Sequence, residues 1–308
     1  MASASGKVIL FGEHAVVYGR PAIAVPVAEL RAWATVDDAP PGAGCTVVAI
    51  DLKRRFSLAD APPDDPLALI VRLTLAGLGL VAEPDWTITL RSDIPIASGL
   101  GSGAAVSTAI VRALAQHAGR SLPPDAVSAL VYETERLHHG TPSGIDNTVV
   151  AYEQPVYFVR GQPPQPCRVG GEFWLAIADT GVASPTKLAV EDVRRAWQAD
   201  PARYEALFDE MGRIAERARQ AIETGRLDAL GPLMDENQRL LSAIGVSSPL
   251  LERLCAAARQ AGAGGAKLSG AGHGGNLIAL VTPQTAEKVA AALRAAGAVR
   301  VVISQVVR

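Results

Sequence analysis

The first stretch that could do chemistry is glycine-rich: residues 94–110 read IPIASGLGSGAAVSTAI. Gly99, Gly101 and Gly103 surround Ser102, and a run of small helix-forming residues follows them. Glycine lets backbone amides approach a bound group closely, and the start of a helix adds unpaired N–H groups and the positive end of the helix dipole. The stretch is therefore suited to an anion such as phosphate, and a tight turn that binds nothing is the simpler alternative.

Two common phosphate-binding loops fit this stretch poorly. Residues 99–104 match G-x-G-x-x-A, but the dinucleotide fingerprint needs an acidic residue about 20 positions later, at the end of a second strand. Here residues 117–125 are typical of a helix end and a loop. A Walker loop needs Gly-Lys followed by Ser or Thr, whereas Val8 follows the pair Gly6-Lys7. A kinase loop of a third design remains, and the rest of the chain must decide for or against it.

Composition limits the possible function classes. Acidic and basic residues nearly balance, with a net charge of −2, which argues against a nucleic-acid or membrane-surface protein. Cys45, Cys167 and Cys255 lack paired spacing and predict neither a zinc site nor a disulfide framework. Residues 1–30 show no signal-peptide pattern, and no apolar run approaches the ~18–20 residues of a membrane span. We therefore expect a soluble, cytoplasmic protein.

The order of apolar patterns predicts an α+β protein in two halves. Strands are expected within residues 7–12, 22–38, 45–58, 85–95, 172–180, 265–281 and 298–307, and residues 141–159 are expected to form a turn, a helix or extended piece, and a strand. Helices are expected within residues 64–80, 104–117, 123–140, 186–244, 248–262 and 283–297. Residues 160–171, dense in proline and glycine, are the candidate boundary and divide the chain into domains 1–165 and 166–308.

Five segments taken together resemble the GHMP kinases, a family of small-molecule kinases. They appear in the family's order over nearly the full chain: residues 5–24, 94–110, 133–147, 234–254 and 267–280. The segments GKVILFGEHAVVYG and HGTPSGIDN look most like the mevalonate kinase subfamily. The resemblance implies an amino half similar to domain 2 of ribosomal protein S5, which binds ATP, and a ferredoxin-like carboxyl half. It also implies phosphorylation of mevalonate at its C5 hydroxyl.

Phosphoryl transfer needs the phosphates held, their charge neutralised and the acceptor hydroxyl aligned. The resemblance implies that the phosphates of ATP bind along the backbone of Gly99, Leu100, Gly101, Ser102, Gly103 and Ala104. It also implies that Ser102 and Glu135 hold Mg²⁺.

Simpler roles remain open for both metal-binding residues. Gly103 stands where the family usually has a second serine, so the metal could be held by a side chain, a water molecule or Glu135 alone. Ser102 as a helix cap, Glu135 on a solvated helix face and Glu133 as a rival ligand are the alternatives.

The catalytic residues implied by the resemblance are Asp146 and Lys7. Asp146 would accept or orient the proton of the attacking hydroxyl, and Lys7 would keep that carboxylate ionised. A structural role for Asp146 in bracing its turn, and a solvated terminal position for Lys7, are the alternatives.

The substrate-binding residues implied by the resemblance include both catalytic residues, joined by Glu13, His14, Thr186 and Ala271. His14 would donate a hydrogen bond to the hydroxyl or carboxylate of the substrate. Lys187 could attract the carboxylate, and Thr186 could instead be an ordinary helix cap. The role of His273, where the family more often has glycine, stays open.

Rival functions are a GHMP kinase for phosphomevalonate, homoserine or a sugar, a related ATP-dependent decarboxylase, and an ATP-binding module without activity. Lys7 argues against the decarboxylase, because that class lacks this opening. The oligomeric state is left open, and a homodimer is one possibility.

Overall fold

The computed structural model describes residues 1–80, 82–95, 98–139, 143–184 and 186–307. Its strands are β1 (Ala2–Phe11), β2 (Ala22–Asp38), β3 (Thr46–Ala49), β4 (Arg54–Ser57), β5 (Trp86–Ser92), β6 (Val156–Phe158), β7 (Gln165–Pro166), β8 (Phe173–Asp179), β9 (Gly265–Ser269), β10 (Asn276–Val281) and β11 (Arg300–Val306). Its α-helices are α1 (Pro66–Gly77), α2 (Ser102–His117), α3 (Pro124–His139), α4 (Ile145–Tyr152), α5 (Thr186–Ala199), α6 (Pro201–Thr224), α7 (Leu230–Ala243), α8 (Pro249–Gln260) and α9 (Ala286–Ala295). Two short 3₁₀-helices are η1 (Ala15–Tyr18) and η2 (Leu227–Ala229).

These elements form two compact units that are interleaved along the chain. Among the described residues, the first unit contains 1–6, 30–95 and 101–153, and the second contains 7–29, 98–100 and 154–307. The segment from β1 through η1 to the first part of β2 therefore packs with the carboxyl-terminal half of the chain. Each unit is α+β, which confirms the predicted fold class.

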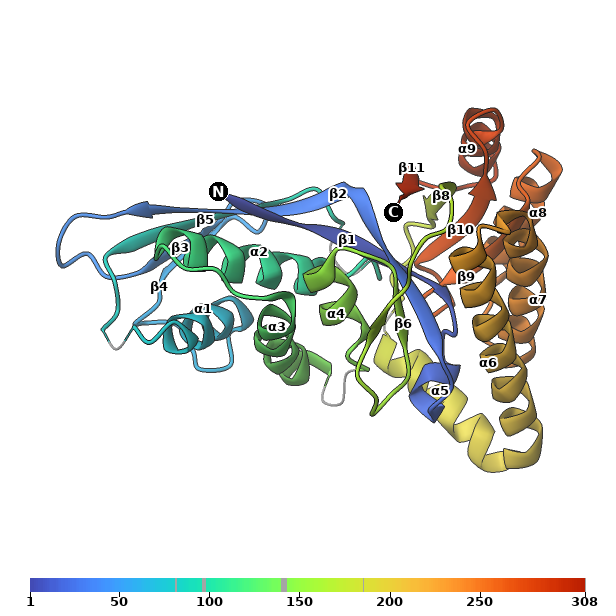
Figure 1. The fold of residues 1–308 in the computed structure, drawn as a ribbon, viewed down its shortest axis with the longest axis horizontal. Coiled ribbons are helices and arrows are strands. Elements are labelled where there is room, and N and C mark those ends of the chain that lie inside the picture. Colours follow the sequence, from blue (N-terminus) through green and yellow to red (C-terminus); the bar gives the residue numbers. More distant parts are fainter. Residues whose placement is uncertain (81, 96–97, 140–142, 185, 308) are drawn as a thin grey trace. The chain divides into compact units, whose positions relative to one another are not determined.

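The first unit is a sheet with its helices packed together beside it (Figure 1). The second half of β2 pairs antiparallel with β5, β3 pairs parallel with β5, and β4 completes the edge against β3. Alternate residues Ala32, Ala34 and Val36 of β2 are buried, as the period of a half-buried strand requires. Helix α1 begins where Asp65 accepts hydrogen bonds from the N–H groups of Leu67 and Ala68.

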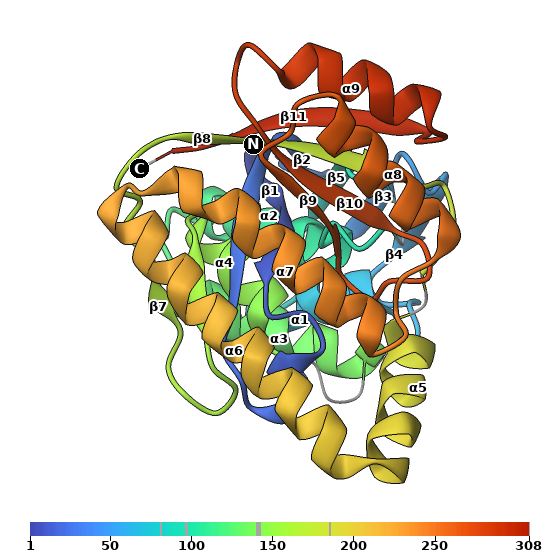
Figure 2. The ribbon, with the colours of Figure 1, turned by 90° about the vertical axis from the view of Figure 1, so that its right-hand side faces the viewer.

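The second unit contains an antiparallel sheet in the order β11-β8-β10-β9. Helices α7 and α8 pack on β9, α9 packs on β8 and β11, and α6 lies along α7 (Figure 2). Helix α8 begins where the Ser248 hydroxyl accepts the Leu251 N–H at 3.4 Å. Among the described helices, none is both long enough and apolar enough to cross a bilayer.

Two features of the amino-terminal elements differ from the expectation. The strand expected at residues 7–12 starts five residues earlier, because the small residues 2–6 extend β1. A 3₁₀-helix, η1, follows it and was not expected. By contrast, residues 22–38 form one strand over the expected range, with Pro26 inside it.

Candidate active site

The amino end of α2 is built to present backbone N–H groups. Gly101 is its N-cap, with φ 73° and ψ 30°, and helical hydrogen bonding starts with Ala105 N–H on the Gly101 carbonyl. The N–H groups of Ser102, Gly103 and Ala104 thus have no acceptor within the helix, and the first turn carries no acidic side chain. Ser102 is the first helical residue and Gly101 is the cap, so the capping role considered for the Ser102 hydroxyl is not the one observed.

The residues before this helix are fastened within the second unit. The Lys7 N–H donates to the Leu100 carbonyl at 2.9 Å, which joins β1 to the loop. The Asn276 side-chain amide, on β10, donates to the Ser98 carbonyl. Lys7 and Leu100 are both buried, and Gly99 has φ 79°, a conformation that favours glycine. The loop is thereby fixed from its amino-terminal side by two strands.

Glu135 of α3 lies next to Gly103 in the first unit. A Cβ added at Gly103 would sit 3.3 Å from Glu135 Oε1, so the carboxylate reaches the first turn of α2. Glu135 is buried, whereas Glu133 is exposed and forms an ion pair with Arg136 at 2.9 Å. Of the two glutamates considered as ligands, Glu135 faces the glycine-rich helix start, and Glu133 belongs to a solvated face.

A divalent cation fits this donor set. Mg²⁺ prefers oxygen ligands and usually takes one or two carboxylates together with the phosphates of its substrate. Ser102 and Glu135 supply one hydroxyl and one carboxylate at the start of α2. No group of three or more His, Cys, Asp or Glu side chains that could hold a metal occurs within the described residues.

Asp146 lies in the first turn of α4, after Gly144 as N-cap with φ 88°. The helix is fastened behind it, because the buried Asn147 amide donates to the Ser128 hydroxyl at 2.8 Å and to its carbonyl at 3.2 Å. Gly140, Thr141 and Pro142, which belong to the same sequence motif, lie outside the described residues.

The segment Gly12-Glu13-His14 makes a strained turn in the second unit. His14 has φ 60° and ψ −50°, and the Ala15 N–H donates to the Glu13 carbonyl at 2.6 Å. This is a γ-turn with positive φ at its central residue, a rare and strained conformation. Gly12, with φ 90°, is required before it, because a Cβ there would overlap the Pro21 carbonyl oxygen.

Glu13 and Lys267 form an ion pair whose side chains are both 0% exposed. The ammonium group of Lys267 donates to Glu13 Oε1 and to the Leu268 carbonyl, and the Asn237 amide lies 3.4 Å from Glu13 Oε2. Burial raises the pKa of Glu13 and lowers the pKa of Lys267, because each charged form loses its hydration. Glu13, expected to face the substrate, is thus bonded through both oxygens to protein side chains.

His14 directs one ring nitrogen at a neighbouring backbone group. Its Nε2 lies 3.0 Å from the Ala271 carbonyl oxygen, so it donates to that carbonyl. Burial lowers the pKa of His14 to about 4, and the nearby His273 adds to that lowering. The imidazole is therefore neutral at physiological pH. His14 and Ala271, two residues predicted to bind substrate, are brought together.

The turn that carries Ala271 is held rigidly between two segments. The His273 N–H donates to the Val246 carbonyl at 2.7 Å, and the Ser184 hydroxyl donates to the Gly272 carbonyl. Gly272 has φ 82°, and a Cβ there would overlap the Val246 carbonyl oxygen. His273 has φ 58° and its side chain is exposed, so its backbone is fixed while its ring faces solvent.

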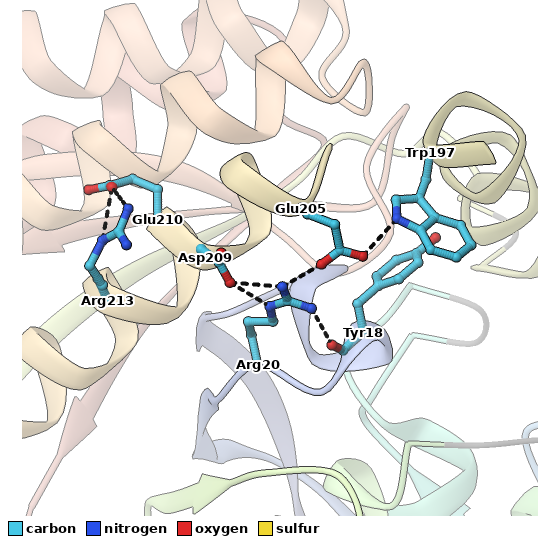
Figure 3. Close-up of polar contacts among 7 residues, drawn as sticks. All are labelled: Tyr18, Arg20, Trp197, Glu205, Asp209, Glu210 and Arg213. Carbon is cyan, nitrogen blue, oxygen red and sulfur yellow. Dashed lines mark hydrogen bonds and ion pairs between the residues drawn. The ribbon is translucent and has the colours of Figure 1, made fainter. Parts of the chain in front are cut away.

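A polar cluster fastens the far end of η1 to α6 (Figure 3). The Arg20 guanidinium forms an ion pair with Glu205, binds Asp209 at 2.8 Å and donates to the Tyr18 carbonyl at 2.7 Å. Trp197 donates to the second oxygen of Glu205 at 2.9 Å. Tyr18 stacks on Phe208, with ring centroids 4.2 Å apart. The turn at His14 is therefore anchored on both sides.

Thr186 and Lys187 are the first two residues of α5, and both are exposed. Their place at the helix start agrees with the capping alternative for Thr186 as well as with a substrate contact, so the predicted contact stays a prediction.

Sequence reasoning missed three buried polar residues of the second unit. Lys267, Asn237 and Asn276 hold the Glu13 turn and the glycine loop. Lys267 stands between Ala266 and Leu268 in an apolar strand, and a lysine in such a run was the available signal.

Family comparisons agree with this arrangement. Residues 68–154 match the model of the GHMP kinases N terminal domain, and residues 218–299 match that of the GHMP kinases C terminal domain. The chain belongs to the GHMP kinase family. Within it, the chain is 35% identical to the mevalonate kinase of Thermococcus sibiricus, over 98% of this chain and 95% of the relative. It is also 35% identical to the mevalonate kinase of Aeropyrum pernix, over 91% and 87%.

Solved structures give the same result. The L. major mevalonate kinase in complex with R-mevalonate superposes with a TM-score of 0.86 at 30% identity, over 99% of this chain and 94% of that one. The phosphomevalonate kinase of Streptococcus pneumoniae, with phosphomevalonate and AMPPNP, has a TM-score of 0.82 at 16% identity, over 98% of each chain. At that identity the second likeness establishes the fold alone.

Proposed function

We propose that this protein is a mevalonate kinase, which transfers the γ-phosphoryl group of ATP to the C5 hydroxyl of mevalonate and releases ADP. The observation that carries the proposal is similarity to enzymes named mevalonate kinase along almost the whole chain, at 35% identity over 98% of it. The mevalonate-bound relative of known structure supports it over 99% of the chain. Residues 1–165 form the ATP-binding domain in this proposal, and residues 166–308 the carboxyl-terminal one.

In this proposal the glycine-rich loop holds the phosphates of ATP through its backbone. The N–H groups of Ser102, Gly103 and Ala104, which have no acceptor within the helix, and the positive end of α2 would stabilise negative charge there. Gly99, Leu100 and Gly101 let the chain approach the phosphates closely. The fastening of Leu100 to Lys7 limits the movement of the loop when the nucleotide binds.

Ser102 and Glu135 would hold Mg²⁺ together with the phosphates. When bound, the ion neutralises charge on the phosphate oxygens. Glu135 contributes a buried carboxylate at the helix start, and Gly103 leaves room for it.

Asp146 would accept the proton of the attacking hydroxyl or orient that hydroxyl. Asp146 lies in the first turn of α4, which fixes the place of its backbone. Lys7 would lower the pKa of the hydroxyl through its positive charge. The two roles are separate expectations.

The acceptor is tested by measuring ADP release with Mg–ATP against mevalonate, 5-phosphomevalonate, homoserine and galactose in parallel. Turnover selective for mevalonate supports the proposal. Turnover with only another acceptor would keep the phosphoryl-transfer chemistry and reject mevalonate as the substrate.

Two pairs of variants test the proposed roles. Asp146→Asn should lower kcat at least about 100-fold, whereas Asp125→Asn, in the exposed first turn of α3, should not. Glu135→Gln should raise the Mg²⁺ concentration for half-maximal rate about 10-fold or more, whereas Glu133→Gln on the solvated face should leave it unchanged. If Asp146→Asn and Asp125→Asn have the same kcat, the catalytic role of Asp146 is rejected. If Glu135→Gln and Glu133→Gln need the same Mg²⁺ concentration, the metal-binding role of Glu135 is rejected.

A further inference from the structure

The antiparallel sheet of the second unit has two edge strands, and they are finished differently. At β9 the Ala266 N–H donates to Asp235 at 2.9 Å, and the Leu268 N–H donates to Gln238 at 2.8 Å. Both acceptors belong to α7, so side chains of this helix close that edge. Strand β11 lies at the other end of the strand order, beside α9, and no strand among the described residues pairs beyond it (Figure 2). A row of unpaired backbone groups is a template for another strand.

The direction of the backbone groups along β11 follows from one contact. The Gln305 N–H points away from β8 and donates to Glu29 Oε1 at 3.3 Å. In an antiparallel strand every second residue faces the same side, so the N–H and C=O groups of Val301 and Ile303 also face away from β8. Glu29 covers the Gln305 end of this row.

The outer row of β11 is complementary to a second copy of itself. When two copies lie antiparallel about a two-fold axis at Ile303, Val301 of one copy faces Gln305 of the other, and their outward groups can pair. The same register places Val299 opposite Val307, once at each end. Val299 is 68% exposed and Val307 is 48% exposed, so an apolar side chain that faces solvent flanks each end of the edge. The antiparallel pairing would cover both valines.

The charges at the two ends of β11 are opposite. Exposed Arg300 begins the strand. At the other end Gln305 donates through its N–H to Glu29 and through its side-chain amide to Glu172 at 2.9 Å, and both glutamates are exposed. An antiparallel partner brings Arg300 of one copy to the carboxylates of the other, whereas a parallel partner in register would bring like charges together. Complementary charge of this kind fixes orientation and register.

We propose that two copies of this chain associate by antiparallel pairing of β11 about Ile303, which joins their four-stranded sheets edge to edge. The Gln305 N–H then donates to the Val301 carbonyl of the other copy, and the Glu29 carboxylate turns to Arg300 of that copy. One short edge buries less surface than the ~1,600 Å² of a standard interface, so the dimer should be weak, with a Kd of about 1–100 µM. The inference does not depend on the proposed function, which assigns none of these residues to ATP, metal or substrate.

Sedimentation velocity at protein concentrations from about 1 to about 200 µM tests the dimer. The parent protein should change from monomer to dimer over this range. Val299→Glu/Val307→Glu places like charges opposite each other at both ends and should raise Kd at least about 10-fold. Val299→Lys/Val307→Glu places opposite charges there in the same register, and its Kd should stay within about 3-fold of the parent's.

A matched control adds the same charge away from the edge. Ile50→Glu/Leu52→Glu changes two exposed apolar side chains of the first unit and should leave Kd unchanged. Circular dichroism checks that all three double variants keep the fold, which is expected because each replaced side chain is exposed.

Amide hydrogen exchange gives a readout that an interface elsewhere on the protein would not give. The N–H groups of Val301 and Ile303 should exchange at least about 5-fold more slowly at the highest concentration than at the lowest. The N–H groups of Ala266 and Leu268, on the closed edge at β9, should exchange at the same rate at both concentrations.

Three results would overturn the inference. The first is a protein that stays monomeric at the highest concentration, including one whose Val301 and Ile303 amides exchange slowly at every concentration because another part of the chain covers the edge. The second is a dimer that Val299→Glu/Val307→Glu does not weaken, because the two copies would then meet at another surface. The third is an equal Kd for the Glu–Glu and Lys–Glu variants, which would reject the antiparallel register.

Discussion

The start of α2 and the turn at His14 are two solutions to holding a polar ligand. At the start of α2 the donors are backbone N–H groups around glycines, and the segment needs no buried charge. At His14 the conformation is strained, and a fully buried ion pair on one side and an arginine cluster on the other hold it. Backbone donors come already oriented by the helix, whereas a side chain that recognises a small substrate must be oriented by its neighbours. The turn should therefore tolerate substitution much less than the loop.

The largest expected effect is at the buried ion pair. Lys267→Met leaves the Glu13 carboxylate buried without its cation, which should cost about 3–5 kcal/mol of stability. Thermal unfolding followed by circular dichroism measures the loss, with Glu13→Gln/Lys267→Met as the comparison. Removing both charges should restore most of the melting temperature. If Lys267→Met is as stable as the parent protein, the turn does not depend on the buried ion pair.

Next come the two glycines that flank the turn. Gly12→Ala combines a positive φ with an overlap against the Pro21 carbonyl, so it should cost about 3 kcal/mol or more. Gly19→Ala is the matched control, because Gly19 has φ 81° but no neighbouring atom within 4 Å. Gly19→Ala should lower the free energy of unfolding by only about 1–2 kcal/mol. The urea midpoints of unfolding of the two variants separate the effect of crowding from the effect of positive φ. If both variants lose the same stability, crowding at Gly12 is not the cause.

A smaller effect is expected from pH. The pKa of His14 falls from 6.5 to about 4 on folding, so between these values the unfolded chain binds more protons than the folded one. Neutral His14 makes its full contribution to the free energy of unfolding above pH 6.5, and this contribution is lost as the pH falls toward 4. Between about pH 8 and about pH 5 the loss should be about 2 kcal/mol. His14→Gln should lack this part of the pH dependence, and an identical profile in both proteins would contradict the assignment.

The smallest effect is expected at the loop. Gly103→Ser restores the hydroxyl usual in the family, and its Cβ would lie 3.3 Å from Glu135 Oε1. The gain in helix propensity and the slight crowding of Glu135 should nearly cancel, so the free energy of unfolding should change by less than about 0.5 kcal/mol. The Mg²⁺ dependence of the rate should change less than about 3-fold. A large loss of activity would show that the loop is as demanding as the turn.

Local signals in the sequence were sufficient for most elements. Ser248 before Pro249 predicted the start of α8, and the apolar run from Phe173 to Asp179 predicted β8. The glycine-rich motif also predicted a helix directly after it, although α2 begins at Ser102, two residues before the expected start at Ala104. In each case the residues that decide the structure are neighbours along the chain.

What could not be predicted depends on residues far apart. Glu13 and Lys267 are separated by 254 positions, so no local pattern joins them. The γ-turn at His14 has no glycine at its centre to announce a positive φ. The tautomer of His14 depends on the Ala271 carbonyl, 257 positions away. Such contacts appear only when the fold brings the segments together.

The interleaving of the two units has a consequence for the order of synthesis. Residues 30–153 leave the ribosome before most of the second unit exists, so the first unit can fold early. Residues 7–29 emerge before them and must wait for partners such as Lys267 and Ser269. Until then the Glu13 carboxylate stays hydrated on a nascent chain. The segment that holds His14 is thus translated before most of the first unit and completed only after the carboxyl-terminal strands have been made.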